Sequence, residues 1–311
     1  MKKFIINIIV LLLIICALIA GGEIYLRSLP NPYSIKKDWM DKNADKLDTL
    51  ILGSSQSEMG VSPKMLGNNT FNLAMPNGLL EYDYYILEKY SPKYKRLKCV
   101  IIELSCYNVF AQKFEDRPHD KYRALFYRIY MDYPVHKYSP YYNFEFSNLD
   151  FFRYRLACAT ESFLFNKPMP DECDSLGWVT GDKRFDKESY ASQVSEIQKT
   201  LEGIKCIDYN MVAYNCHYTD LIIRFCTEHN IEPIIVILPM SNNIVSLIDN
   251  KQLSTFNNII NTYRTHGITT LNYLNDSRFS LSDFINSNHL NRNGAVKLTS
   301  ILKKEISLYQ Q

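Results

Sequence analysis

Continuous apolar runs separated by helical patterns limit the folds open to this chain more than any other feature. One such run extends from Leu97 to Leu104, and a second from Pro233 to Leu238. Strands of this kind are typical of parallel sheets that helices cover on both faces. Helical periodicity appears before and between them, at Gly78 to Tyr90 and at Met211 to His229. The alternation therefore predicts an α/β domain with right-handed crossovers and a doubly wound, mainly parallel sheet.

Weaker patterns complete this predicted domain, which we place at residues 47–311. We expect three further strands and two further helices, at Leu47 to Leu52, Thr70 to Ala74, Thr269 to Tyr273, Val245 to His266 and Arg292 to Leu308. Between about residues 107 and 210 the regular alternation stops, and tyrosine and phenylalanine become frequent. We interpret this stretch as a largely helical insertion whose aromatic side chains pack together. Stacking of these rings on sugars is the alternative.

The amino terminus differs in composition from the rest of the chain. Residues Phe4 to Gly22 carry no charged side chain, and two lysines precede them. This length suits a helix that crosses a bilayer. The lysines favour an amino terminus in the cytoplasm and a main domain outside it, in the periplasm or at the cell exterior. We predict an uncleaved transmembrane anchor at residues 1–22 and a polar stalk at 23–46, with a cleaved signal peptide as the alternative.

Overall composition excludes several functional classes. With 311 residues, 46% hydrophobic and 22% charged, the chain suits one sizeable globular domain with an insertion. A net charge of +2 without a long basic run gives no reason to expect nucleic acid binding. The sequence holds no phosphate-binding or dinucleotide-binding motif. The spacing of Cys216, His217, Cys226 and His229 suits helix packing better than zinc. We expect neither a cofactor nor a metal.

A serine and a histidine stand out as candidate catalytic residues. The first predicted strand ends at Gly53, which permits a sharp turn and directs Ser55 outward at the carboxyl end of the sheet, where ligands bind in such folds. His289 lies in the loop before the last predicted helix, so it should reach the same edge. Serine is a poor nucleophile until an imidazole accepts its proton. We therefore predict Ser55 as nucleophile and His289 as base.

Groups that could stabilise a developing oxyanion follow the first three predicted strands. They are the backbone N–H of Ser55, the pair Asn77 and Gly78, and Ser105 or Asn108. Three strand ends would thus supply polar groups to one region.

Together these segments resemble the SGNH (GDSL-like) hydrolase superfamily. Its four sequence blocks are matched by Gly53-Ser54-Ser55, Asn72 to Gly78, Glu103 to Asn108, and His289 to Ala295. Ser54 replaces the usual aspartate of the first block, Ser55 matches the nucleophile, and Asn108 is slightly displaced. The resemblance covers most of Leu47 to Leu308 apart from the insertion, and it implies an SGNH/flavodoxin-like sheet.

One departure from the family concerns the residue that orients the histidine. The family's aspartate lies three residues before the histidine, and that position holds Asn286 here. An asparagine carbonyl can orient the ring, but it stabilises an imidazolium less than a carboxylate does. We prefer a serine–histidine dyad assisted by Asn286. Orientation by Asp283 and an inactive descendant are the alternatives.

With a predicted membrane anchor and a Gly-Ser-Ser first block, the chain resembles the membrane-tethered relatives in this superfamily. These are the D-alanine-transfer proteins of teichoic acid modification and the alginate-type O-acetylation proteins. The resemblance implies a single-pass, extracytoplasmic serine O-acyltransferase that modifies a cell-surface polysaccharide through an acyl-serine intermediate. It also implies a membrane-bound O-acyltransferase as partner. A carbohydrate esterase and a non-catalytic SGNH-like polysaccharide-binding or assembly protein are the alternatives.

Overall fold

The computed structural model describes the chain except for residues 118–119, 135–138, 167–172, 181–206, 287 and 310–311. It forms two compact units. The helical unit comprises residues 1–37 and 113–172, and the α/β unit comprises residues 38–112 and 173–311. Residues 113–172, within the predicted insertion, therefore group with the amino-terminal helix. Residues 181–206 of that predicted insertion lie outside the described residues.

A five-stranded parallel sheet forms the centre of the α/β unit, as predicted. In the order β2-β1-β3-β4-β5, its strands are β2 (Thr70–Asn72), β1 (Thr49–Leu52), β3 (Cys99–Glu103), β4 (Glu232–Ile237) and β5 (Thr269–Asn272). The register pairs Leu52 of β1 with Ile102 of β3. The chain adds β2 on one side of β1 and the later strands on the other. The carboxyl ends of β1 and β3 therefore flank the point where ligands bind in such sheets.

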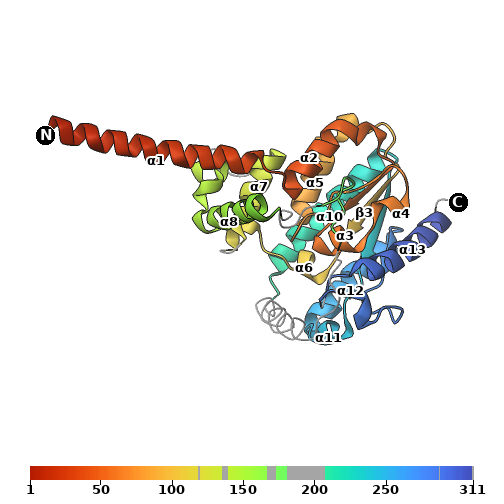
Figure 1. Cartoon of the computed structure of the whole chain (residues 1–311). Helices are drawn as coiled ribbons and strands as arrows, with labels where there is room; N and C mark the ends of the chain where they lie inside the picture. Colours follow the sequence, from red (N-terminus) through yellow and green to blue (C-terminus); the bar gives the residue numbers. More distant parts are fainter. Residues whose placement is uncertain (118–119, 135–138, 167–172, 181–206, 287, 310–311) are drawn as a thin grey trace. The chain divides into compact units, whose positions relative to one another are not determined.

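Helices bury both faces of this sheet (Figure 1). They are α3 (Ser55–Gly60), α4 (Pro63–Leu66), α5 (Leu80–Lys89), α6 (Cys106–Val109), α10 (Tyr209–Glu228), α11 (Asn242–Val245), α12 (Asn250–Thr265) and α13 (Arg292–Tyr309), with 3-10 turns η1 (Ala44–Lys46), η2 (Ser91–Lys93) and η6 (Leu281–Asp283). Helix α13 packs on α3 and α4. Its Leu298 and Leu302 join Ile51 and Ile101 in one core cluster. Leu50 and Val100 point to the other face, because side chains alternate along a strand, and they are equally buried.

The helix predicted at residues 245–266 begins five residues later than expected. Helix α11 ends at Val245 and α12 begins at Asn250, and Asp249 caps α12 by accepting hydrogen bonds from the backbone N–H groups of Lys251 and Gln252. Aspartate at this position satisfies N–H groups that a helix start leaves without partners. The later start therefore follows from a cap within the apolar pattern.

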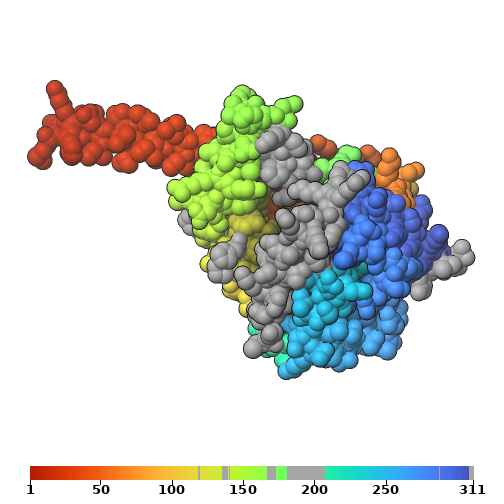
Figure 2. Space-filling view, turned by 60° about the horizontal axis from the view of Figure 1, so that its bottom comes forward, coloured from red at the N-terminus to blue at the C-terminus, as the bar shows by residue number. Residues whose placement is uncertain are grey.

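The helical unit contains α1 (Lys2–Ser28), the start of α2 (Pro32–Asn43), α7 (Lys121–Met131) and α8 (Leu149–Phe165), with 3-10 turns η3 (Phe114–Asp116), η4 (Pro140–Asn143) and η5 (Glu145–Ser147). Helix α1 is long and apolar enough to cross a membrane, with a mean hydropathy of 3.1 over a window that is 0% buried. Its atoms extend beyond those of the rest of the unit (Figure 2). It continues past the predicted anchor boundary at residue 22, and most of the predicted stalk is helical.

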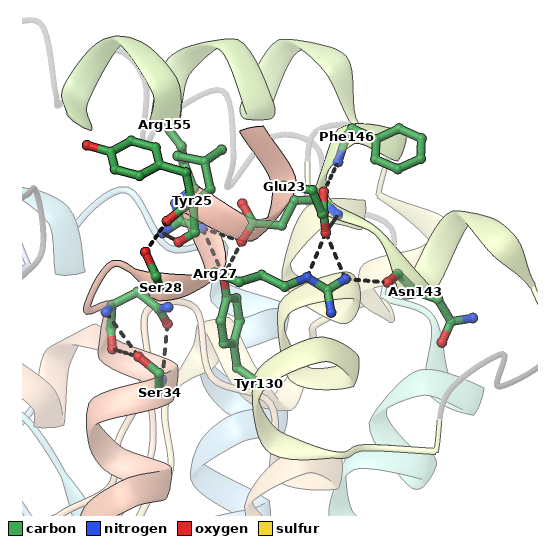
Figure 3. A network of polar contacts seen from close by, with 12 residues as sticks. Glu23, Tyr25, Arg27, Ser28, Ser34, Tyr130, Asn143, Phe146 and Arg155 are labelled. Carbon is green, nitrogen blue, oxygen red and sulfur yellow. Dashed lines mark hydrogen bonds and ion pairs between the residues drawn. The ribbon is translucent and has the colours of Figure 1, made fainter. Parts of the chain in front are cut away.

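A buried polar network joins the end of α1 to the turn before α8 (Figure 3). The carboxyl group of Glu23 accepts hydrogen bonds from the backbone N–H groups of Glu145 at 2.9 Å and Phe146 at 3.1 Å, and from Arg27 Nε at 2.7 Å. Arg155 of α8 forms an ion pair with Glu145 and a hydrogen bond with Tyr130. These contacts fix the end of α1 to its own unit. They also give the carboxyl group of Glu23 hydrogen-bond partners within the protein in place of water.

Aromatic side chains of the predicted insertion pack on one another. The rings of Tyr122 and Phe151 stack with centroids 4.0 Å apart, and Phe126 meets Tyr130 edge to face at 5.3 Å. Such pairs stabilise a small helical unit beyond their burial alone.

Candidate active site

Ser55 is the first residue of α3, directly after the turn that ends β1. Gly53 makes the turn with a φ of 140°, in the region that favours glycine. A Cβ added at Gly53 would lie 2.5 Å from Cβ of Glu103. Only glycine therefore lets the chain pass Glu103 this closely. Ser54 caps α3, and Ser55 is half-buried at its start.

Glu103, the last residue of β3, stabilises this turn through hydrogen bonds. Its completely buried carboxyl group accepts hydrogen bonds from the backbone N–H of Ser54 at 2.8 Å, from Ser54 Oγ at 2.6 Å and from the backbone N–H of Ser57 at 3.0 Å. Its partners lie in the turn after the neighbouring strand, so Glu103 positions the backbone on both sides of Ser55.

Asn72 at the end of β2 supports α3 from the other side. Its buried amide donates to the carbonyl oxygens of Ser57 at 2.9 Å and Val61 at 3.0 Å, while its Oδ1 accepts the backbone N–H of Ala74 at 3.1 Å. From the sequence we assigned no role to this side chain. The sequence did offer one signal for such a role, because Asn72 begins the segment that resembles the second block of the SGNH superfamily.

The loop that carries His289 is closed by local hydrogen bonds. Phe284 and Leu290 form an antiparallel bridge, and Ile285 N–H donates to the carbonyl oxygen of His289 at 2.9 Å. Gln56 of α3 donates to the carbonyl oxygen of Asn288 at 3.3 Å. Loop and helix are thus joined next to the serine.

Ser55 and His289 lie within hydrogen-bonding distance. Ser55 Oγ is 2.8 Å from His289 Nε2, and His289 Nδ1 is 3.0 Å from Asn286 Oδ1. The same Asn286 atom accepts the backbone N–H groups of Asn288 at 3.2 Å and His289 at 2.8 Å. Only the amide oxygen can accept from both, so Nδ1 of the neutral ring must carry the proton. Nε2 is left with its lone pair directed at the serine hydroxyl.

The surroundings of His289 favour the neutral ring. Burial lowers its pKa to about 4, because desolvation penalises the charged imidazolium. In the described part of the chain, no carboxylate hydrogen-bonds the ring to offset that penalty. His289 is therefore available as a proton acceptor at neutral pH, but its protonated form is weakly stabilised.

Asp283, the alternative orienting residue, has other partners. Its Oδ2 accepts hydrogen bonds from Lys297 Nζ at 2.6 Å and from the backbone N–H of Ser280 at 2.9 Å. It anchors the start of the loop on α13. In this structure Asn286, not Asp283, contacts the imidazole.

The candidate oxyanion donors differ in whether their backbone N–H groups already have a hydrogen-bond acceptor. The backbone N–H groups of Ser55 and Asn77 donate to no described residue, whereas Gly78 N–H donates to the carbonyl oxygen of Met75 at 2.8 Å. Asn77 has a left-handed φ of 55° and is exposed. Gly78 contributes close packing instead, because an added Cβ would lie 2.1 Å from the carbonyl oxygen of Gly53.

Ser105 and Asn108 bond to each other. Asn108 Oδ1 accepts the backbone N–H of Ser105 at 2.9 Å, Ser105 Oγ accepts that of Asn108 at 3.3 Å, and Asn108 Nδ2 donates to the carbonyl oxygen of Glu103 at 2.9 Å. Both side chains are buried and form the cap of α6. This bonding supports the strand end that carries Glu103, and it leaves the backbone N–H groups of Ser55 and Asn77 as the candidate oxyanion donors without a partner among the described residues.

The chain matches no protein-family model, and no curated protein matches it. Within the described residues, no group of three or more His, Cys, Asp or Glu side chains is arranged to hold a metal ion. The geometry itself thus defines the site: a serine–histidine pair at the carboxyl edge of a parallel sheet.

Proposed function

We propose that the protein is a membrane-anchored, extracytoplasmic serine O-acyltransferase that acts on a cell-surface polysaccharide through an acyl-serine intermediate. The observation that carries this proposal is the 2.8 Å contact between Ser55 Oγ and His289 Nε2, with the ring oriented by Asn286. A hydroxyl facing the lone pair of a neutral imidazole is the arrangement that activates serine.

The chemistry proceeds in two transfers. His289 Nε2 accepts the Ser55 proton while Oγ attacks the carbonyl carbon of an ester, and the Ser55 N–H donates to the oxyanion. The imidazolium then protonates the departing alcohol, which leaves an acyl group on Ser55. In the second transfer His289 deprotonates a sugar hydroxyl, which attacks the acyl-serine, and the proton returns to Ser55.

Membership of the SGNH superfamily is part of the proposal. It is supported by the Gly-Ser-Ser turn, by Gly78 packed against that turn, by the hydrogen bond of Asn72 to α3, and by the strand order around β1 and β3. The departure at Asn286 concerns the strength of the base, since the contact to Nδ1 is kept.

The membrane setting is supported by α1 alone. In the described part of the chain, one helix is long and apolar enough to cross a membrane, and its apolar segment follows two lysines, which fits a single-pass protein with a cytoplasmic amino terminus. We propose that a membrane-bound O-acyltransferase supplies the acyl group to the tethered domain.

The function is tested with the full chain in proteoliposomes, supplied with 4-nitrophenyl acetate and an unacetylated polysaccharide. We expect mass spectrometry to find acetyl on the Ser55 peptide and then on the sugar. Rapid loss of acetyl to water in the presence of sugar would favour the esterase alternative. Release of nitrophenol without any acetyl-serine, or no reaction in folded protein, would favour the non-catalytic alternative.

A pH profile tests the role of Asn286. Acylation by the parent should rise as His289 loses its proton near pH 4 and then level off, because only the neutral ring accepts a proton. Asn286→Asp places a carboxylate at Nδ1, which favours the imidazolium and raises the pKa of His289. The acidic limb of the profile should therefore move to higher pH by roughly one to three units. It should also raise the rate on the plateau. The measurement is the rate of acyl-serine formation from pH 3 upward.

Asp283→Asn serves as the matched control, because Asp283 bonds to Lys297 and not to the ring. It should leave the acidic limb where it is in the parent. An unchanged limb in Asn286→Asp, or an equal shift in both variants, would contradict the assigned contact.

A further inference from the structure

Helix α8 meets α1 at the place where the apolar run of α1 ends. An added Cβ at Gly22 would lie 3.2 Å from Cζ of Phe152, and Arg155 Nη2 donates to the carbonyl oxygen of Leu26 at 3.4 Å. Gly22 is also the last residue of the charge-free segment. If α1 crosses a bilayer, α8 lies at the boundary between acyl chains and water. Figure 3 shows Arg155 beside the polar network that ends the apolar part of α1.

One face of α8 exposes large apolar side chains. Leu149, Leu156 and Phe163 are 59%, 38% and 82% exposed, and Leu164 beside them is 63% exposed. A spacing of seven residues, or about two helical turns, places the first three on one stripe. We call these four residues the α8 stripe. The neighbouring exposed flank carries Asp150, Ala157 and Glu161, and beyond them Tyr154 and Phe165, which are also exposed.

The contacts of α8 also show which part of the helix lies nearer the apolar run of α1. Around the helix, Phe152 adjoins the stripe, while Arg155 lies in the middle of the buried face. Phe152 meets α1 at Gly22, whereas Arg155 meets it four residues further from the apolar run, at Leu26. Of these two contacts, the one beside the stripe therefore lies nearer the apolar run of α1.

We propose that α8 lies in the interface of the same bilayer that α1 spans, with the α8 stripe among the headgroups and upper acyl chains. Helices with one apolar and one charged flank bind membranes in this way. Arg153, which projects within the stripe, can keep its aliphatic stem among apolar groups while its guanidinium reaches lipid phosphates. The inference rests on the proposed membrane anchor and not on the proposed acyl transfer. Its consequence is that the helical unit is fixed at the membrane surface by two elements.

Depth-dependent quenching tests the position of α8. The full chain is reconstituted in nanodiscs whose lipids carry bromine on the upper acyl chain, and Phe163→Trp is compared with Ala157→Trp on the charged flank. Fluorescence of the native Trp39 and Trp178 is measured in the parent and subtracted. We expect several-fold stronger quenching for Phe163→Trp than for Ala157→Trp. Ile14→Trp, at the middle of the span, is measured in nanodiscs whose lipids carry bromine near the ends of the acyl chains, and it reports whether α1 itself is inserted.

The outcomes separate the anchor from the new surface. Strong quenching at Ile14→Trp with none at Phe163→Trp would overturn the proposal while the anchor stands, and would favour a protein as occupant of the stripe. Equal quenching of Phe163→Trp and Ala157→Trp would overturn the assigned orientation. An unquenched Ile14→Trp would remove the anchor and this inference together, while acetylation of Ser55 would still report separately on the enzyme.

Discussion

Ser55→Ala is expected to abolish labelling by a fluorophosphonate probe and to lower the rate of acyl transfer by about 10⁴-fold or more. The size follows from nucleophile deletions in other serine enzymes, where only binding and the oxyanion donors continue to act. Ser55 Oγ is the hydroxyl that hydrogen-bonds His289 Nε2, so no neighbouring serine can replace it in the same geometry. Gel fluorescence of the labelled protein and the initial rate of transfer measure the effect.

Ser57→Ala is the matched control, since this serine lies two residues further along in α3 and so points to a different side of the helix. Its hydroxyl is buried and has no hydrogen-bond partner among the described residues. Removing an unpaired buried hydroxyl should be neutral or slightly stabilising. Labelling should therefore persist in Ser57→Ala. Labelling that persists in folded Ser55→Ala would disprove the assignment of the nucleophile.

The sheet could be predicted from the sequence because burial of a strand on both faces requires a continuous run of apolar residues. The strands β3 and β4 need apolar side chains at nearly every position, and a helix must connect each parallel pair. The closeness of Ser55 and His289 follows from the same topology, since loops after parallel strands gather at one edge. The structure places their side chains in contact across 234 positions of sequence, while their chemical roles stay predictions.

The supporting hydrogen bonds could not be predicted in the same way. Glu103 reaches Ser54 only because the register sets Leu52 beside Ile102, and a sequence does not display register. Likewise, the pairing of Glu23 with the backbone of Glu145 joins segments 122 positions apart without any repeating pattern. Contacts of this kind depend on tertiary geometry. The cap at Asp249 is different, because an aspartate just before a helical pattern is a local signal that a sequence does display.

Glu103→Ala is expected to lower the free energy of unfolding of the α/β unit by about 4 kcal/mol. The substitution leaves two backbone N–H groups and one hydroxyl without their acceptor in a fully buried place, and each such loss costs about 1–3 kcal/mol. Both tryptophans of the chain, Trp39 and Trp178, belong to this unit. Denaturant unfolding followed by their fluorescence, with the full chain in detergent, therefore measures the change.

Glu232→Ala is a fitting control, because this glutamate is exposed at the start of the adjacent strand, and among the described residues its side chain accepts one hydrogen bond, from Thr269 Oγ1 at 3.2 Å. It should change the free energy of unfolding by less than about 1 kcal/mol. Glu103→Ala should also slow acylation of Ser55 under conditions where the protein remains folded, since the backbone on both sides of Ser55 loses its support. A folded Glu103→Ala protein that acylates at the parental rate would show that the turn holds Ser55 without this carboxyl group, and Gly53 with Asn72 would then be sufficient to position the nucleophile.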